Sequence, residues 1–120
     1  RRLIDAGLNT EEKNDLAFEF QNVIAECLLN KVGLAIDHLK KKYKINNFIL
    51  SGGVASNSFI RLKFQELCNR KQLSFYAPEK NLCVDNATMI AWAGLEMLNN
   101  GKKGNIIHSS PKPRWRIDKI

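Results

Sequence analysis

The chain has 120 residues, a formal net charge of +7 and 44% hydrophobic residues. This length suits one ordinary domain, and the apolar share excludes a wholly disordered chain. No apolar run approaches the roughly 18 residues of a membrane-spanning helix, so we expect no membrane partner. The chain begins with two arginines and no methionine, which indicates a fragment or a processed product. Its total positive charge weakly favours a nucleic-acid partner, although lysines on solvated helix faces explain any single cluster better.

The first predicted element is a helix that begins near Asn14. Acidic residues lie near its start and lysines near its end, as the helix dipole favours. Gly33 indicates a kink or a close packing contact, and the length of the stretch predicts a break near it. Apolar side chains recur at steps of three and four residues, at Leu16, Phe20, Val23, Ile24, Cys27, Leu28, Ala35, Ile36 and Leu39.

The rest of the chain alternates strands with helices. Residues 45–50 read as a strand buried on both faces, as in parallel sheets. A second amphipathic helix covers residues 60–68, and a second strand covers residues 73–77 and ends at a proline. After a loop at 78–86, residues 87–98 are apolar enough to form a largely buried helix, which Asn99, Asn100 and Gly101 terminate.

The predicted order is therefore α-β-α-β-α, which gives an α/β layer fold with right-handed crossovers. Two strands make a poor sheet. We therefore expect further strands on the N-terminal side of this segment.

The stretch "ILSGGVASN" is the first candidate site. Gly52 and Gly53 directly follow the first strand, and ligands of open α/β sheets bind at the carboxyl ends of strands. Glycines let the backbone approach a phosphate or sugar closely. Asn57 either caps the next helix or reaches a nucleotide hydroxyl. A plain strand-to-helix turn and a ligand loop explain the stretch about equally well.

Asp85, in "CVDNATMIAWAG", is the second candidate. It precedes the third helix, so its residue chemistry favours a helix N-cap, a role that Asn86 could share. The alternative is a carboxylate ligand for a metal at the same sheet edge. One carboxylate does not make a metal site.

The remaining candidate residues give weaker evidence for a catalytic or metal site. His38 and His108 are not spaced as a ligand pair, and Ser51 and Ser56 have no evident base. Trp115 lies between two arginines and either stacks on bases or anchors the tail. The three cysteines have neither zinc nor disulfide spacing and predict reduced core thiols of an intracellular protein: Cys27, Cys68 and Cys83.

Three stretches, "SGGVASN", "LCVDNATMIAWAGLEML" and "PKPRWRIDKI", together resemble the TsaD family of tRNA threonylcarbamoyl transferases. The resemblance runs from about Asp15 to the end. The amino-acid sequence of the glycine loop, residues 51–57, is more similar to that of the mitochondrial branch than to that of the bacterial branch. The resemblance therefore implies a mitochondrial protein, with the bacterial cytoplasm as the alternative.

The resemblance implies the actin-like, sugar-kinase and heat-shock ATPase fold, which has two ribonuclease-H-like halves. Residues 1–101 are similar to the final α-β-α-β-α part of the C-terminal half, without its upstream strands. Residues 102–120 would form a basic C-terminal tail.

The resemblance also implies an activity: transfer of threonylcarbamoyl from its adenylate to the adenosine next to the tRNA anticodon. Asn57 would contact the adenylate, Gly52 and Gly53 would form the loop beside it, and Asp85 would bind a divalent metal, iron or zinc. The family's two metal-binding histidines belong to the missing N-terminal half, and neither His38 nor His108 matches them. We therefore expect the chain alone to be inactive and to hold metal poorly.

The implied partners are tRNA, threonylcarbamoyl-adenylate, the missing N-terminal half and, in the mitochondrial branch, a second copy in a homodimer. Two other functions stay open at this point. One is the C-terminal segment of a carbohydrate kinase of the same fold, and the other is a non-catalytic RNA-binding scaffold. A scaffold would bind RNA with a steep salt dependence and would ignore nucleotides.

Overall fold

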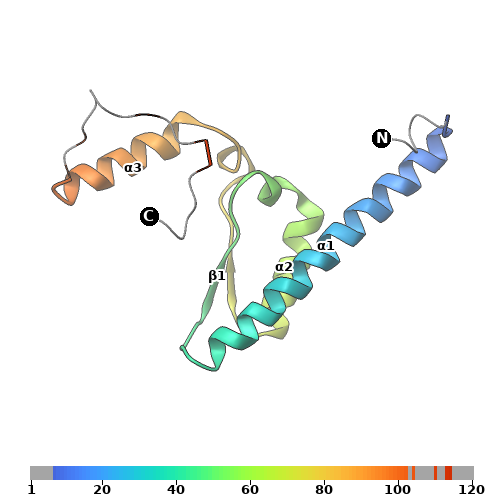
Figure 1. Ribbon diagram of the computed structural model, residues 1–120, viewed down its shortest axis with the longest axis horizontal. Helices are drawn as coiled ribbons and strands as arrows, with labels where there is room; N and C mark the ends of the chain where they lie inside the picture. The colour runs from blue at the N-terminus through green and yellow to red at the C-terminus, as the bar shows by residue number, and fades with distance from the viewer. Residues whose placement is uncertain (1–6, 103, 105–109, 111–112, 115–120) are drawn as a thin grey trace. The chain divides into compact units, whose positions relative to one another are not determined.

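The computed structural model describes residues 7–102, 104, 110 and 113–114. Contacts divide the chain into two compact units, Arg1–Asp85 and Asn86–Ile120. The predicted order of elements is confirmed, with two short 3₁₀ turns added (Figure 1). The elements are α1 (Thr10–Lys40), β1 (Asn47–Ile49), η1 (Gly53–Ser56), α2 (Ser58–Arg70), β2 (Ser74–Tyr76), η2 (Lys80–Leu82) and α3 (Ala87–Asn99). The predicted boundary between residues 101 and 102 lies inside the second unit and stays a prediction.

Helix α1 begins earlier than predicted because Asn9 forms a capping box with Glu12. The Asn9 side chain accepts a bond from the Glu12 N–H at 2.9 Å, and the Glu12 carboxylate accepts one from the Asn9 N–H at 2.8 Å. The helix runs without interruption through Gly33, so the predicted break is wrong. Gly33 is buried instead, where a Cβ would lie 3.9 Å from Cδ1 of Leu67, which confirms the close packing contact.

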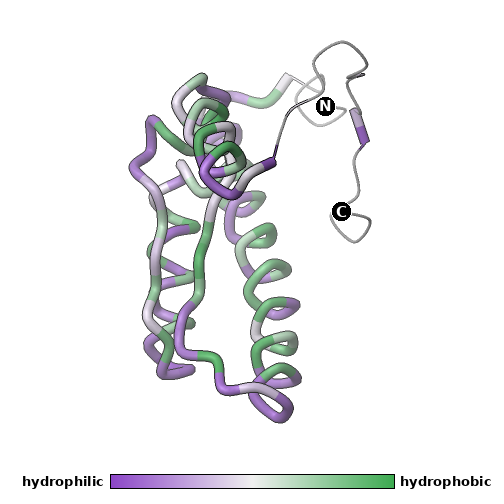
Figure 2. The backbone as a smooth tube through the Cα atoms, turned by 90° about the vertical axis from the view of Figure 1, so that its left-hand side faces the viewer, coloured by the Kyte–Doolittle hydropathy of each residue, from purple (hydrophilic) through white to green (hydrophobic). Residues whose placement is uncertain are grey.

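The two strands pair in parallel, with Phe48 opposite Phe75. On the inner face the Phe48 ring stacks on Phe64 of α2, with 5.4 Å between centroids. Hydrophobic residues recur along both helices of this unit (Figure 2). The core that they form with the sheet contains Ile36, Ile60, Phe64, Leu67, Cys68 and Leu73.

The other face of the sheet is open within the described residues, so the prediction of a strand buried on both faces is wrong. Ile49 and Tyr76 are register partners there and are 70% and 55% exposed. The physical reason is that α1 and α2 lie on the same side of β1 (Figure 1). The apolar run that predicted two buried faces therefore has only one helical layer against it in this unit.

The second unit contains α3, which ends where the sequence predicted. The N–H groups of Gly101 and Lys102 donate to the carbonyls of Leu98 and Met97, both at 2.9 Å, and Gly101 has φ +71°. This is a Schellman motif. No residue of α3 is buried, so the prediction of a largely buried helix is wrong for the described residues. Its apolar side chains surround the helix, and Trp92 is 64% exposed.

Three further expectations can be compared with the structure. Cys68 and Cys83 are buried as predicted, whereas Cys27 is exposed on α1. His38 lies on the exposed side of α1, while His108 and Trp115 lie outside the described residues. No helix in the described part of the chain is long and apolar enough to cross a membrane.

Candidate functional site

The loop after β1 needs a glycine at its first position but not, for folding, at its second. Gly52 has φ +86° and ψ 175°, a backbone region that essentially only glycine adopts. Gly53 has no positive φ, and a Cβ built on it would meet no atom within 4 Å. The turn therefore explains why residue 52 is a glycine. It does not explain why residue 53 is one, because among the described residues Gly53 faces open space.

Asn57 caps α2, as one of the two alternatives predicted. Its Oδ1 accepts bonds from the N–H groups of Phe59 at 2.9 Å and Ile60 at 3.1 Å. Its Nδ2 donates to Oε1 of Gln21 on α1 at 2.9 Å. An amide nitrogen carries two hydrogens, so one donor of Asn57 is left for another acceptor. Contact between Asn57 and an adenylate stays a prediction.

Arg61 connects the glycine loop to the loop that precedes Asp85. Its Nε donates to the carbonyl of Ala55, and one terminal nitrogen donates to the carbonyl of Pro78. The same nitrogen lies 3.2 Å from Sγ of Cys83. One half-buried guanidinium therefore fixes both loops where they leave the carboxyl ends of the two strands.

Sequence reasoning missed Arg61, which counted only as one of many surface cations. Its position four residues after Asn57 places it one helical turn beyond the cap, on the face of α2 that meets both loops. That spacing was the available signal. A second tie between the same regions is the bond from Nζ of Lys80 to the Ser58 hydroxyl, at 2.5 Å.

Asp85 is exposed and does not cap α3, so the N-cap interpretation of this residue is wrong. The capping oxygen must come from the residue directly before the helix, and that residue is Asn86, whose Oδ1 accepts from the N–H of Met89 at 3.0 Å. The Asp85 carboxylate has no ion pair or hydrogen bond with the described residues. Both loops lie at the carboxyl edge of the sheet, because parallel strands end on the same side.

The described residues do not by themselves fit the metal that the resemblance implies. Among them, no three histidine, cysteine, aspartate or glutamate side chains lie close enough together to hold an ion. Asp85 is a single hard oxygen ligand, and a protein metal site needs several ligands. A metal at Asp85 therefore needs ligands from outside the part of the chain described here.

Comparison with known proteins decides the family. The family model for TsaD, described as tRNA N6-adenosine threonylcarbamoyltransferase, matches residues 2–92, which include both loops, Asn57 and Arg61. The chain belongs to the TsaD family. This assignment confirms the resemblance and, with the small parallel sheet, the mixed α/β class.

Several bacterial proteins named tRNA N6-adenosine threonylcarbamoyltransferase are similar to this TsaD segment. The protein from Chelativorans sp. (strain BNC1) is 37% identical over 117 residues, which cover 94% of this chain and 32% of that relative. Relatives from Agrobacterium fabrum and Rhizobium etli are 34% and 33% identical with the same coverage. The chain therefore spans about a third of the length of the curated relatives it matches.

Proposed function

We propose that this chain is part of a tRNA threonylcarbamoyl transferase. The whole enzyme would move threonylcarbamoyl from its adenylate to the exocyclic amine of the adenosine next to the anticodon. Family membership carries this proposal, because the matched region contains the glycine loop and the Asp85 loop that Arg61 joins. Membership also argues against the carbohydrate-kinase alternative.

In this proposal the glycine loop holds the adenylate. Gly52 makes the turn, and the open space beside Gly53 admits the adenylate close to the backbone. The remaining amide hydrogen of Asn57 donates to the nucleotide, while its oxygen keeps α2 in place. The cap and the ligand contact are compatible, since they use different atoms of one side chain.

Asp85 would supply one carboxylate ligand to a divalent metal, iron or zinc, whose other ligands come from the rest of the enzyme. Its exposed carboxylate, without a partner among the described residues, supports this role. Such a metal acts as a Lewis acid toward a carbonyl oxygen. This chain would contribute a single ligand and the loop that holds it.

We further propose that the segment is the last α-β-α-β-α part of the C-terminal ribonuclease-H-like half. Two surfaces support this placement: the open face of the sheet and the exposed apolar side chains of α3. Both have the composition of a core that additional chain would cover. A homodimer stays a prediction. The bacterial relatives support the bacterial cytoplasm rather than the mitochondrion that the glycine-loop spelling suggested.

The test uses the complete enzyme with threonylcarbamoyl-adenylate and unmodified tRNA, and reads the nucleosides by mass spectrometry. Gly53→Ala should keep the fold, because its Cβ has space, but should weaken adenylate binding at least tenfold. Asn57→Asp keeps the capping oxygen and removes the amide donor. It should therefore keep helix α2 while lowering adenylate affinity, since a carboxylate also repels the phosphate.

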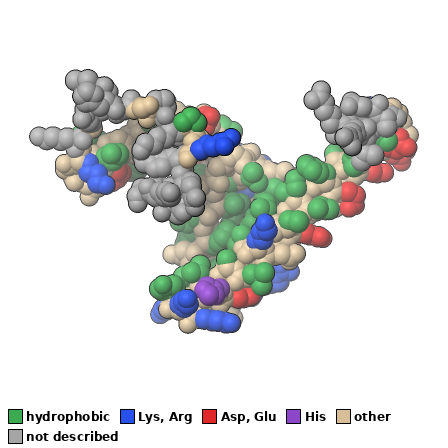
Figure 3. All heavy atoms as spheres, in the orientation of Figure 1, with side chains coloured by type: hydrophobic (Ala, Val, Ile, Leu, Met, Phe, Trp, Pro, Cys, Tyr) green, Lys and Arg blue, Asp and Glu red, His purple; other side chains and the backbone are tan. Residues whose placement is uncertain are grey.

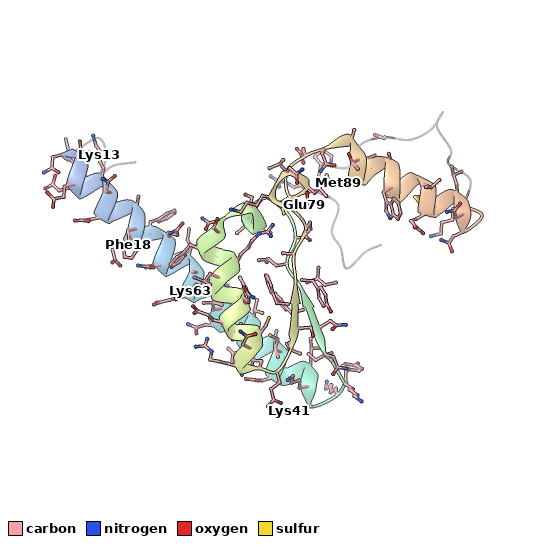
Figure 4. All side chains as sticks on the ribbon, turned by 180° about the vertical axis from the view of Figure 1, so that it is seen from behind. Lys13, Phe18, Lys41, Lys63, Glu79 and Met89 are labelled. Atoms are coloured by element: carbon pink, nitrogen blue, oxygen red, sulfur yellow. The ribbon has the colours of Figure 1, made fainter. Side chains whose placement is uncertain are left out.

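Asp85→Ala should lose both bound metal and activity while the enzyme stays folded. Glu79→Gln is the matched control, because Glu79 is an exposed carboxylate in the same loop (Figure 4). Full activity and full metal content in Asp85→Ala would refute the ligand role. A wild-type enzyme that forms no modified adenosine, yet binds RNA with a steep salt dependence, would point to the scaffold alternative.

A further inference from the structure

A turn at the amino edge of the sheet combines lysines with an exposed aromatic ring. Residues 41–44 follow α1 and read Lys-Lys-Tyr-Lys. The N–H groups of Lys42 and Tyr43 both donate to the carbonyl of Leu39, at 3.0 and 2.8 Å, so the turn is fixed rather than frayed. Tyr43 is 62% exposed, and its ring stacks on no other described ring.

The stability of α1 does not explain why lysines occupy positions 42 and 44. Lys40 and Lys71 are engaged, since Lys40 donates to the Lys71 carbonyl and Lys71 forms an ion pair with Asp37 at 2.6 Å. Lys42 and Lys44 lie beyond the last helical residue, where the interaction with the helix dipole has largely decayed. No hydrogen bond or ion pair joins their side chains to the described residues. Lys and Arg side chains gather beside the histidine at this end (Figure 3).

We propose that residues 41–44 are a second contact surface for tRNA, separate from the glycine loop. Lys42 and Lys44 would neutralise phosphates, and the Tyr43 ring would stack on an unpaired base. Cations interleaved with an exposed aromatic suit unpaired RNA, because phosphates and base faces are presented together there. An acidic protein surface or a lipid headgroup would use the lysines but would give the ring no base to stack on.

The position of the turn explains why two surfaces are needed. Figure 4 shows Lys41 and Glu79 at opposite ends of the first unit. From residue 44 the chain runs along β1 to Gly52, which is at most roughly 27 Å for an extended segment of this length. A tRNA whose adenosine lies at the glycine loop is large enough to reach this turn. The inference rests on the proposed function, because that function supplies the RNA.

The first test measures the affinity of the complete enzyme for unmodified tRNA by fluorescence anisotropy between about 0.05 and 0.2 M salt. Lys42→Gln with Lys44→Gln is compared with Lys13→Gln and Lys31→Gln, two exposed lysines on α1, so that the net charge changes equally. The first pair should reduce the magnitude of the log K against log salt slope by about 1.4–1.8, since each phosphate contact contributes about 0.7–0.9. The control pair should leave it within experimental error.

The second test separates stacking from charge. Tyr43→Leu should weaken tRNA binding roughly tenfold, and Tyr43→Phe should bind like wild type because the ring remains. Equal slopes for the two lysine pairs, or wild-type affinity in Tyr43→Leu, would overturn the proposal. So would variants that bind tRNA normally but lose binding to phosphatidylserine vesicles, which would assign the turn to a lipid surface.

The nucleoside assay distinguishes this inference from the proposed function. If the enzyme forms the modified adenosine but the variants of the turn bind tRNA normally, only the second surface is refuted. If the variants lose tRNA affinity as expected while the wild type makes no modified adenosine, the surface stands as an RNA contact and the proposed reaction fails.

Discussion

Replacing Arg61 by methionine should loosen both loops of the candidate site together. Methionine keeps much of the apolar stem of arginine but removes every donor, so the carbonyls of Ala55 and Pro78 lose their shared partner. The Pro78 carbonyl also accepts a weak bond from the Cys83 thiol, whose Sγ lies 3.8 Å away, but a neutral thiol is a far weaker donor than the guanidinium. Because the two loops come from different strands, the loss of one residue should be felt at both.

The size of the effect follows from the two charge-assisted bonds. Hydrogen bonds to charged groups contribute about 1.5–3 kcal/mol each when buried. Arg61 is only half-buried, so solvent compensates for part of the loss, and we expect the free energy of opening of the loops to fall by about 2 kcal/mol. Amide exchange should then speed up about thirtyfold. Arg61→Lys, which can keep one of the bonds, should give a smaller increase.

Hydrogen exchange of the complete enzyme measures this directly, because both loops contain bonded amides. The N–H groups of Ala55 and Asn57 report on η1, and those of Leu82 and Cys83 report on η2. Lys63→Met is the control, since Lys63 pairs with its neighbour Glu66 on α2, at 3.3 Å, and lies over the Phe59 ring, and no bond joins it to either loop among the described residues. If Arg61→Met leaves all four amides within about twofold of wild type, the guanidinium does not hold the loops together.

Three further predictions concern stability and thiol chemistry. Gly52→Ala should destabilise the glycine loop by about 1–3 kcal/mol, because alanine is strained at φ +86°, and this should appear as faster exchange in η1. Asn86→Ala should cost about 1 kcal/mol of α3 stability, whereas Asp85→Ala should cost almost none, and circular dichroism during thermal unfolding compares the two. Burial raises the pKa of the Cys68 thiol, so less thiolate exists at a given pH, and iodoacetamide should label Cys68 only after unfolding, as peptide mass spectrometry would show. Labelling of native Cys68 at neutral pH would contradict this.

The sequence predicted the parts of the fold that depend on local patterns. The recurrence of Ile60, Phe64 and Leu67 gave the inner face of α2, and the glycine after Asn100 gave the end of α3. The prediction that β1 is buried on both faces was wrong, because an apolar run shows that a strand can be buried but does not show how many layers pack against it.

The candidate site was only partly predictable for a different reason. Asn57 lies directly before a helix, so its capping role can be predicted from a few neighbouring residues. Asp85 and Asn86 are both good caps, and only backbone geometry decides that the second one is used. Arg61 acts on residues 17 and 22 positions away, and although its spacing from Asn57 indicates the correct face of α2, that spacing does not identify such distant partners.

The distribution of buried residues along α1 determines which part of this helix unfolds first. All three buried residues lie at or beyond Ala25, and the Asn57 side chain bonds α1 at Gln21, so within the described part of the chain residues 10–20 have little tertiary support. A helical stretch of that length is marginal in water on its own, which leaves the Asn9 capping box as a main restraint on its first turn. Fraying should therefore start at Thr10 and stop near Gln21, where Asn57 bonds the helix. A protease would therefore reach Lys13 long before Lys31.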